Sequence, residues 1–327
     1  MASLTVKLET PVTGPYEQPI GFTSVFEGNE KDVDLAVTAA RKAFETTWKR
    51  STPEHRGRLM YKLADIAEEN KELLAAVESL DNGKSVNNAR GDVAAVIGCL
   101  RYYAGWADKI EGKTIDIAPD MFHYTRSEPI RVCGEIIPWN FPLLMFAWKI
   151  GPALVIGNTV VMKTAEQTPL SGLVFTQFIQ QAGFPPGVAF TGSTVVGRQI
   201  MKAAAASNLK KVTLELGGKS PNIVFDDANI EEAVDWVNFG IYYNHGQICC
   251  AGSRVFVQDG IYDKFLKAFK KWARQNKVGD LFQEETFQGP QVSKLQYDRV
   301  MSYVDSGRAD GATVVTGGCR HGVFYFF

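Results

Sequence analysis

The stretch V-V-M-K-T-A-E-Q-T-P at residues 160–169 decides the fold class of this chain. Its apolar, β-branched beginning is typical of a buried strand, which ends at Lys163. Pro169 lies where a helix begins, because proline is tolerated in the first helical turn. A strand that leads directly into a helix is the repeating unit of a parallel α/β sheet.

Helix and strand alternate on both sides of this stretch. We expect helices near residues 143–156, 169–181 and 195–206, and strands near 159–163, 188–190 and 211–216. Strands that are separated by helices of this length pair in parallel, so the pattern predicts a doubly wound α/β layer. Ligands bind such a layer at the carboxyl ends of its strands, and we expect the functional residues there.

Different patterns flank this layer. Apolar residues at helical spacing predict helices from Asp32 and from Pro53. Residues 122–126 and 132–137 alternate with period two and predict a β-hairpin. A second α/β region begins near residue 222, and we expect its sheet to be incomplete within this chain.

The composition is that of a globular protein with a sizeable core. The chain has 327 residues, of which 45% are apolar, and its 35 basic and 36 acidic residues give a net charge of -1. No basic run could follow a phosphate backbone, so we do not expect nucleic acid as a partner. The longest apolar tract, 141–157, is interrupted by Lys149 and Pro152, and residues 1–7 lack the features of a signal sequence. We therefore expect a cytoplasmic protein with no membrane partner.

The cysteines do not indicate a metal site. Five cysteines and four histidines are scattered without the spacing of metal ligands, and an odd number of cysteines argues against a disulfide framework. His245 lies four residues before Cys249, but two further ligands are missing nearby in the sequence. We expect no bound metal.

The cysteine with the most distinctive surroundings is Cys249, in the stretch Y-N-H-G-Q-I-C-C-A-G-S-R at residues 243–254. This stretch predicts a glycine-flanked turn between an apolar helix and a β-branched strand. A thiol nucleophile reacts as its thiolate, which needs partial exposure and nearby N–H groups or positive charge. Such a turn can provide both, although an inert, buried cysteine is the other interpretation that the pattern allows.

Polar side chains also follow the predicted strands. Asn140, between two prolines, can donate a hydrogen bond to an oxyanion, or it can cap a rigid turn. Lys163 and Glu166 can hold a ribose, and the carboxylate would repel a 2′-phosphate, which favours NAD over NADP; the alternative is a solvated strand end. Glu215, which we expect among apolar neighbours, can act as a general base, or it can face water on an edge strand.

Together these segments resemble the aldehyde dehydrogenase superfamily. The motifs P-W-N-F-P, K-x-A-E-Q-T-P, F-T-G-S-T, L-E-L-G-G-K-S-P and G-Q-x-C-x-A-G-S-R follow one another in the family's order. The resemblance implies that Cys249 is the nucleophile, that Asn140 donates to the oxyanion and that Glu215 activates a water. It also implies NAD as the cofactor and a small-molecule aldehyde as the substrate. The residues that it implies around the dinucleotide are Ile137, Trp139, Lys163, Glu166, Gly192, Ser193, Val196 and Leu216.

The resemblance also implies the architecture. We expect an α/β fold with a doubly wound parallel-sheet dinucleotide domain, a truncated α/β catalytic domain and a protruding β-hairpin. The expected parts are an N-terminal helical part that packs on the cofactor domain over residues 1–120, an oligomerisation-type hairpin over 121–137, a dinucleotide-binding domain over 138–217 and an incomplete catalytic domain over 218–327. Members of the family form homo-oligomers, and this hairpin resembles half of their oligomerisation element.

The chain departs from the family's pattern at several places. Ala189 directly follows Val188, where the family has a further strand, turn and helix, so roughly one βα unit is missing. Arg131 stands where the family usually has glycine. The main hypothesis is oxidation of an aldehyde to a carboxylic acid, with hydride transfer to NAD, through a cysteine thiohemiacetal and thioester. The alternative is a catalytically dead or weakened member that binds a nucleotide or a partner.

Overall fold

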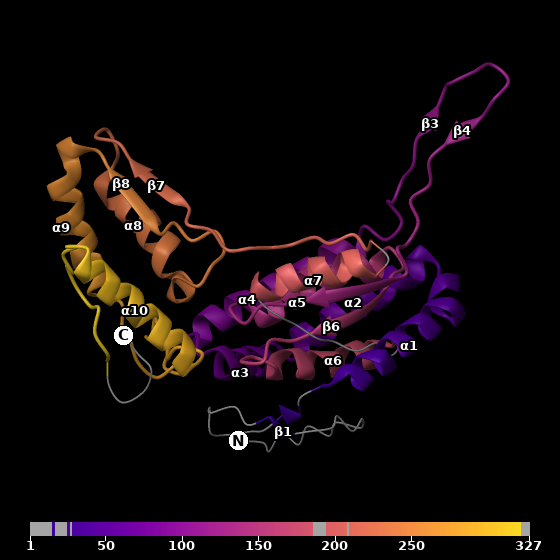
Figure 1. The fold of residues 1–327 in the computed structure, drawn as a ribbon, viewed down its shortest axis with the longest axis horizontal. Coiled ribbons are helices and arrows are strands. Elements are labelled where there is room, and N and C mark those ends of the chain that lie inside the picture. Colours follow the sequence, from indigo (N-terminus) through magenta and orange to yellow (C-terminus); the bar gives the residue numbers. More distant parts are fainter. Residues whose placement is uncertain (1–14, 17–24, 27, 186–193, 208, 322–327) are drawn as a thin grey trace. The chain divides into compact units, whose positions relative to one another are not determined.

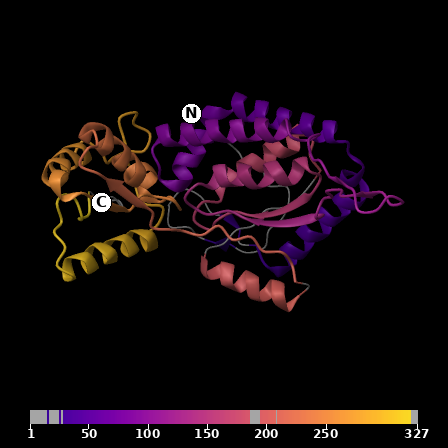
Figure 2. The same cartoon turned by 90° about the horizontal axis from the view of Figure 1, so that it is seen from above.

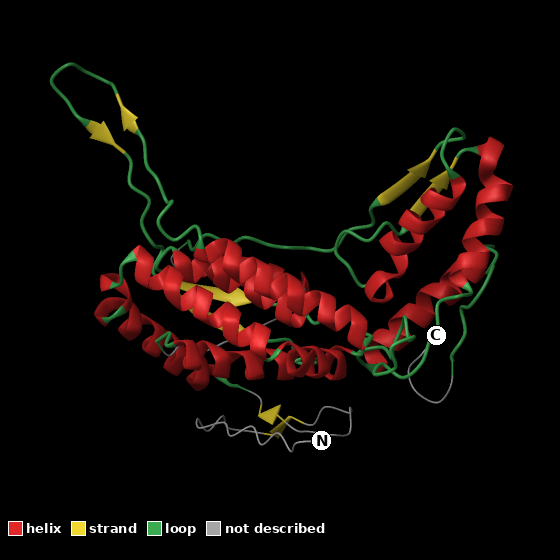
Figure 3. Ribbon diagram, turned by 180° about the vertical axis from the view of Figure 1, so that it is seen from behind, coloured by secondary structure: helices red, strands yellow, loops and turns green. Residues whose placement is uncertain are grey.

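The chain divides into two units in the computed structural model, which describes residues 15–16, 25–26, 28–185, 194–207 and 209–321 (Figure 1). The first unit comprises residues 1–77 and 90–192, and the second comprises 78–89 and 193–327. Figure 3 shows helices throughout and short strands, which form four two-stranded sheets among the described residues. Within those same residues, no helix has the length and apolar character that crossing a membrane requires.

The first unit is mainly helical. Its elements are β1 (Pro15–Tyr16), β2 (Val25–Phe26), α1 (Glu30–Thr46), η1 (Trp48–Arg50), α2 (Pro53–Glu69), the first part of α3 (Lys71–Asn82), most of α4 (Val86–Ala104), β3 (Thr114–Ile115), β4 (His123–Tyr124), β5 (Val132–Ile136), α5 (Pro142–Val155), β6 (Thr159–Lys163) and α6 (Leu170–Ala182). The helix boundaries follow from local chemistry. Asn29 and Asp32 form a capping box at the start of α1, and Thr52 caps α2 just before Pro53. Gly183, with a φ of 100°, ends α6.

The core of the first unit surrounds a pair of parallel strands, β5 and β6. Their register runs from Val132 opposite Thr159 to Ile136 opposite Lys163, and every residue of β6 is buried. Helix α1 packs on this pair through Ala36 and Ala40, while α5 contacts β6 and α6 packs on α5 (Figure 2). The predicted strand at 159–163 and the predicted helices on either side of it are confirmed. The strand expected near 188–190 lies outside the described residues.

The predicted hairpin has different strand partners from those we expected. Strand β4 pairs antiparallel with β3, not with residues 132–137, and those residues form β5 beside β6. A glycine closes the base of the hairpin, because a Cβ at Gly112 would lie 1.8 Å from the carbonyl oxygen of Thr125. The period-two alternation identified the strands but not their partners. β5 pairs with β6 because β6 is buried and covers one of its edges, whereas a hairpin partner nearby in the sequence would be exposed. In Figure 1 the hairpin extends away from the helices of its own unit.

The second unit contains another parallel strand pair. Its elements are α7 (Thr194–Ala206), β7 (Pro221–Val224), α8 (Ile230–Tyr242), η2 (Tyr243–Gly246), β8 (Arg254–Val257), η3 (Asp259–Ile261), α9 (Tyr262–Ala273) and α10 (Lys294–Ala309), together with the end of α3 and the start of α4. β7 and β8 are paired from Pro221 opposite Arg254 to Val224 opposite Val257. A small core of Val224, Val234, Val237, Ile261 and Phe265 joins this pair to α8 and α9.

The strand expected at 211–216 is absent, since residues 209–220 have no regular secondary structure and belong to no sheet among the described residues. An isolated strand is not stable, because its backbone N–H and C=O groups need a neighbouring ladder. Residues 193–217 also group with the second unit rather than with the predicted dinucleotide domain, and residues 78–89 group with it rather than with the N-terminal part. The three predicted domain boundaries otherwise remain predictions.

Candidate active site

Cys249 lies in the loop that joins α8, through η2, to β8, as the sequence suggested. Its side chain is exposed, and so is that of Cys250. The thiol is therefore accessible, which favours the catalytic interpretation over that of an inert core residue. Partial burial and the adjacent Cys250 nevertheless raise the pKa of the Cys249 thiol above its ordinary value. A neighbouring group must therefore help to deprotonate it.

Glycines shape this loop because the backbone passes very close to other groups. A Cβ at Gly246 would lie 2.8 Å from the carbonyl oxygen of Ile241, and one at Gly252 would lie 2.1 Å from Asn222 Nδ2. Asn222 Nδ2 donates to the carbonyl oxygen of Gly252 at 3.0 Å, which ties the loop to β7. Both ends of the cysteine loop are therefore fixed to regular elements of the second unit.

The segment that carries Glu215 reaches the same loop. The N–H of Gly218 donates to the carbonyl oxygen of Cys249 at 2.9 Å. Glu215 itself is exposed, so our expectation that apolar neighbours would bury it is wrong. The reason is that its segment forms no strand in which one face would be covered. The structure thus brings the segment of the predicted base to the predicted nucleophile, with the carboxylate in water.

The predicted cofactor residues of the first unit gather at the carboxyl ends of β5 and β6. Ile137 is fully buried, and its N–H donates to the carbonyl oxygen of Lys163 at 3.3 Å. Lys163 Nζ forms an ion pair with Glu166 Oε1 and donates to the carbonyl oxygen of Thr164 at 3.3 Å. Lys163 is buried, whereas the Glu166 side chain is half exposed. An ammonium donor and a carboxylate acceptor therefore lie side by side at this strand end.

The other predicted residues are distributed over both units. Trp139 and Asn140 are half-buried between β5 and α5 in the first unit. Leu216 is 49% exposed in the second unit, and Val196 lies in the first turn of α7. Gly192 and Ser193 lie outside the described residues. The roles assigned to all of these residues stay predictions.

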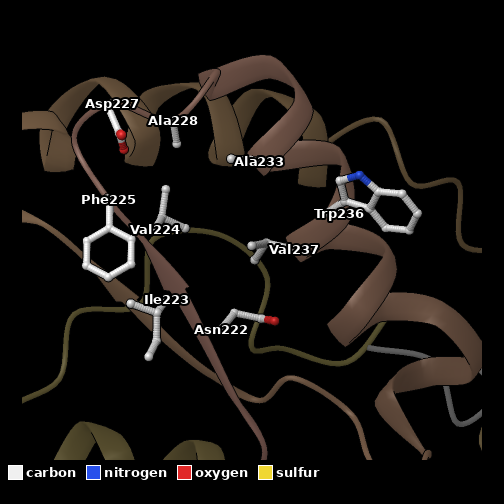
Figure 4. A pocket seen from close by; sticks show the side chains of 9 residues that line it. All are labelled: Asn222, Ile223, Val224, Phe225, Asp227, Ala228, Ala233, Trp236 and Val237. Atoms are coloured by element: carbon white, nitrogen blue, oxygen red, sulfur yellow. The ribbon is translucent and has the colours of Figure 1, made fainter.

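The second unit also has a pocket of about 260 Å³, which Figure 4 shows between β7 and α8. Its lining is Asn222, Ile223, Val224, Phe225, Asp227, Ala228, Ala233, Trp236 and Val237. None of the predicted catalytic or cofactor residues lines it, so it is not the candidate site. The described residues also contain no group of three or more histidine, cysteine, aspartate and glutamate side chains placed to hold a metal ion.

Comparison with known proteins decides the family. The family model described as "Aldehyde dehydrogenase family" matches residues 6–189 and 188–326. The chain belongs to the aldehyde dehydrogenase family. An aldehyde dehydrogenase of Davidiella tassiana is 58% identical over 368 residues, which cover 97% of this chain and 74% of that relative. The human mitochondrial aldehyde dehydrogenase is 51% identical over 321 residues, which cover 90% of this chain and 62% of the human one.

Solved structures confirm the predicted fold class. The NAD+ complex of an aldehyde dehydrogenase from Bacillus cereus is 49% identical, with a TM-score of 0.87, over 91% of this chain and 66% of that one. A complex of PnpE with nicotinamide adenine dinucleotide has a TM-score of 0.88 at 43% identity, over 93% of this chain and 67% of that one. By family, therefore, the chain is an NAD-dependent aldehyde dehydrogenase with an α/β dinucleotide-binding fold. It spans about two thirds of the length of these solved aldehyde dehydrogenases.

Sequence reasoning missed two features that this member of the aldehyde dehydrogenase family carries. Glu135 lies inside β5, where burial raises the pKa of its carboxyl to about 7 and its Oε2 has no hydrogen-bond partner. An acid within an otherwise apolar run, V-C-G-E-I, was the available signal. The second feature is a buried ion pair between Lys84 and Glu78. Lys84 lies in the stretch D-N-G-K-S at residues 81–85, whose composition is typical of a turn, so nothing local indicates that this lysine is buried.

Proposed function

We propose that this chain oxidises an aldehyde to a carboxylic acid through a covalent intermediate on Cys249. The observation that carries the proposal is the hydrogen bond from Gly218 N to Cys249 O, which joins the two motifs that supply nucleophile and base. The family supports it as well. Because the chain spans only part of the length of its relatives, its activity is an inference about this chain and not a property carried over from them.

The cofactor residues fit a dinucleotide by their chemistry. A ribose offers neighbouring hydroxyl groups, which need both acceptors and donors, and the Glu166 carboxylate and Lys163 ammonium supply both at one strand end. The carboxylate also repels a 2′-phosphate, which selects NAD. Bound there, NAD would supply the acceptor for the hydride. The half-buried Trp139 and the buried Ile137 would provide the apolar side of this site.

The chemical steps then follow from the side chains. The Cys249 thiolate attacks the carbonyl carbon of the aldehyde, and the oxygen of the resulting thiohemiacetal accepts hydrogen bonds from Asn140 Nδ2 and the N–H of Cys249. The C–H bond breaks with its electron pair as hydride leaves, and the carbon becomes a thioester. Glu215 takes a proton from a water that attacks this thioester. The C–S bond breaks, the acid departs, and the thiolate is regenerated.

The exposure of Glu215 supports its role as base. An exposed carboxylate can reach a water, and its segment is not held in a sheet, since residues 209–220 belong to none among the described residues. The raised pKa of the Cys249 thiol means that the resting nucleophile is protonated at neutral pH. We therefore expect NADH formation to accelerate as pH rises toward the pKa of this thiol.

The test is NADH formation by the purified full chain with NAD and a small aldehyde. Cys249→Ala should abolish NADH formation, because it removes the thiol that the proposal makes the nucleophile. Cys250→Ala is the matched control, since this neighbouring thiol is equally exposed, and it should retain activity within about threefold. A chain that is folded by circular dichroism but gives no NADH, or a Cys249→Ala variant as active as wild type, would refute the proposal.

One observation favours a second candidate, a family member that binds a nucleotide without turnover. The family model matches in two segments that meet at residues 188–189, where we expect a βα unit to be missing. Loss of a strand beside the cofactor residues would shift them, and a displacement of about 1 Å can cost roughly 100-fold in rate. This candidate predicts that NAD binds, that Lys163→Ala weakens its binding, and that Cys249→Ala leaves it unchanged.

A further inference from the structure

Three segments that are far apart in the sequence meet next to the loop of residues 247–253, which carries Cys249. All three belong to the second unit. They are residues 78–87, residues 281–291, and the turn 242–247 that precedes Cys249. Two hydrogen bonds join the first two: Val86 N donates to Leu281 O at 2.8 Å, and the side-chain Nδ2 of Asn87 donates to Glu284 O at 2.6 Å.

The closest approach between these segments is made by two glycines. A Cβ at Gly289 would lie 2.1 Å from the carbonyl oxygen of Gly83, and one at Gly83 would lie 2.2 Å from the carbonyl oxygen of Pro290. Gly83 also has a φ of +87°, which favours glycine. The backbones of these two segments are thus in contact where they cross. This contact fixes the position of residues 288–291 relative to residues 83–84.

A fully buried ion pair lies at this crossing. Lys84 Nζ is 3.5 Å from Glu78 Oε1, and neither side chain is exposed. Ser79 Oγ donates to the carbonyl oxygen of Lys84 at 2.6 Å, which holds the backbone of the lysine as well. Burying two charges costs free energy that their attraction does not reliably offset. An arrangement of this kind therefore calls for a role beyond stability.

The turn before Cys249 is strained and is held by the same segments. Asn244 and His245 have left-handed backbones, with φ of 49° and 61°, and Gly246 follows with a φ of 69°. Residues other than glycine are disfavoured in this region and persist only where their surroundings enforce them. Gln247 Nε2 donates to Gln291 Oε1 at 2.6 Å, and Gln288 Nε2 donates to Tyr242 O at 3.4 Å.

His245 connects this turn to the ion pair. Its imidazole lies near Gln247 and the backbone of Gly289, and the positive charge of Lys84 acts on it. Burial, with the lysine charge as a further cause, lowers the pKa of the His245 imidazole to about 4. The ring is therefore neutral at physiological pH, and a neutral ring can both donate and accept in this network.

We propose that Gln291 and the buried Lys84–Glu78 pair are positioning residues that hold the 244–247 turn in its left-handed conformation and thereby set the reactivity of the Cys249 thiol. The inference rests on the proposed function, since it concerns the predicted nucleophile. Its physical basis is geometric. The pair ties Lys84 to Glu78 within one segment, and the adjacent Gly83 meets Gly289 and Pro290 of the other. Gln247 donates to Gln291 of that second segment and lies two residues before Cys249.

The test measures the alkylation rate of Cys249 by iodoacetamide in the full chain, read at residue 249 by peptide mass spectrometry in a Cys250→Ser background. Gln291→Ala should change this rate by roughly three- to tenfold, as expected for loss of one hydrogen bond. Gln291→Glu keeps an acceptor oxygen for Gln247 and should restore most of the rate. Gln283→Ala is the matched control, because this exposed glutamine lies in the same 281–291 segment and donates only to Asp280.

Substitution of Gln247, the donor of the hydrogen bond to Gln291, distinguishes a positioning role from a general loss of structure. Gln247→Leu should change the alkylation rate as Gln291→Ala does, and the double variant should add little further change. Glu78→Gln, which removes the carboxylate charge from the pair, should alter the rate in the same direction. Equal alkylation rates for Gln291→Ala and Gln283→Ala, or fully additive effects at 247 and 291, would overturn the proposal. Alkylation requires no turnover, so failure of NADH formation leaves this test intact.

Discussion

At the scale of single residues, the environment of each ionisable group decides what it can contribute. Cys249 is accessible, but its raised pKa keeps the thiol protonated until a base acts on it. Glu135 is the opposite case: a carboxyl enclosed in the first unit, with its Oε2 sealed from solvent. The positive charge of Lys149 favours the ionised form of Glu135. Burial outweighs this effect and raises the pKa of the Glu135 carboxyl to about 7. The Cys249 thiol therefore needs a base before it can react, and the Glu135 carboxyl costs free energy to ionise.

Glu135→Gln should stabilise the protein at alkaline pH. The folded-state pKa of about 7 exceeds the ordinary value of 4.5, so the folded chain holds a proton that the unfolded chain releases between these values. Stability is therefore lost as pH rises from about 4.5 to 7, by up to roughly 3 kcal/mol. The amide cannot ionise, so the Tm of Glu135→Gln should exceed that of wild type at pH 8 and approach it at pH 4.5.

The control for this prediction is Glu128→Gln, an exposed acid of the same unit. Its Tm relative to wild type should not depend on pH. If the Tm difference of Glu135→Gln were the same at both pH values, the buried carboxyl would not be the cause.

At the scale of elements, the backbone at Arg131 stands out. This residue directly precedes β5 and has a φ of +94°, a conformation that favours glycine, which the family resemblance also led us to expect here. It is held there by its neighbours, since Arg131 N donates to Asn158 Oδ1 at 3.0 Å and Arg131 O accepts from Thr159 N at 2.8 Å. The hydrogen bonds of the strand pair therefore enforce a conformation that a side chain disfavours.

Arg131→Gly should stabilise the first unit. Relief of the left-handed strain exceeds the entropic cost of glycine, which leaves a gain of about 1 kcal/mol. The expected result is a rise in Tm of about 2–4 °C by circular dichroism. Arg126→Gly is the matched control, because this exposed arginine does not have a positive φ, and it should lower Tm slightly or leave it unchanged. A Tm for Arg131→Gly at or below that of the control would contradict the argument.

The same scale shows what the sequence could predict. Local periodicity and caps identified α5, β6, α6 and α7 within a residue or two, because each depends on its own stretch of chain. Pairing was harder, because the choice of β6 over β4 as the partner of β5 depends on burial far along the sequence. The motif around Cys249 placed the thiol in an exposed turn, but the Lys84–Glu78 pair beneath it could not be anticipated from residues 81–85.

At the scale of the whole molecule, the hairpin of the first unit presents apolar side chains to solvent. Ile117 is 64% exposed, Phe122 76% and Tyr124 66%. A contiguous apolar patch on a soluble protein commonly marks an association surface. We therefore propose that copies of this chain associate through the hairpin. The family resemblance led to the same expectation of a homo-oligomer.

Phe122→Ser should weaken this association. Sedimentation velocity of the wild-type chain should show species larger than the monomer that increase with concentration, and the variant should shift them toward the monomer. Phe282→Ser, an exposed phenylalanine of the second unit, is the control and should sediment as wild type does. A wild-type chain that stays monomeric at every concentration would show that the hairpin has no such role.

The crossing of Gly83 and Gly289 has a consequence for how the protein can be divided. A fragment that starts at residue 193 would lack residues 78–89, and with them the Lys84–Glu78 ion pair and the backbone of Gly83 that meets Gly289. It would still contain Cys249. Its polar interior would be opened to water, and the turn before the thiol would lose what enforces it. The reactivity of Cys249 thus depends partly on residues that lie more than half the chain length away in the sequence. A fragment designed to contain the second unit must therefore include residues 78–89 as well as 193–327.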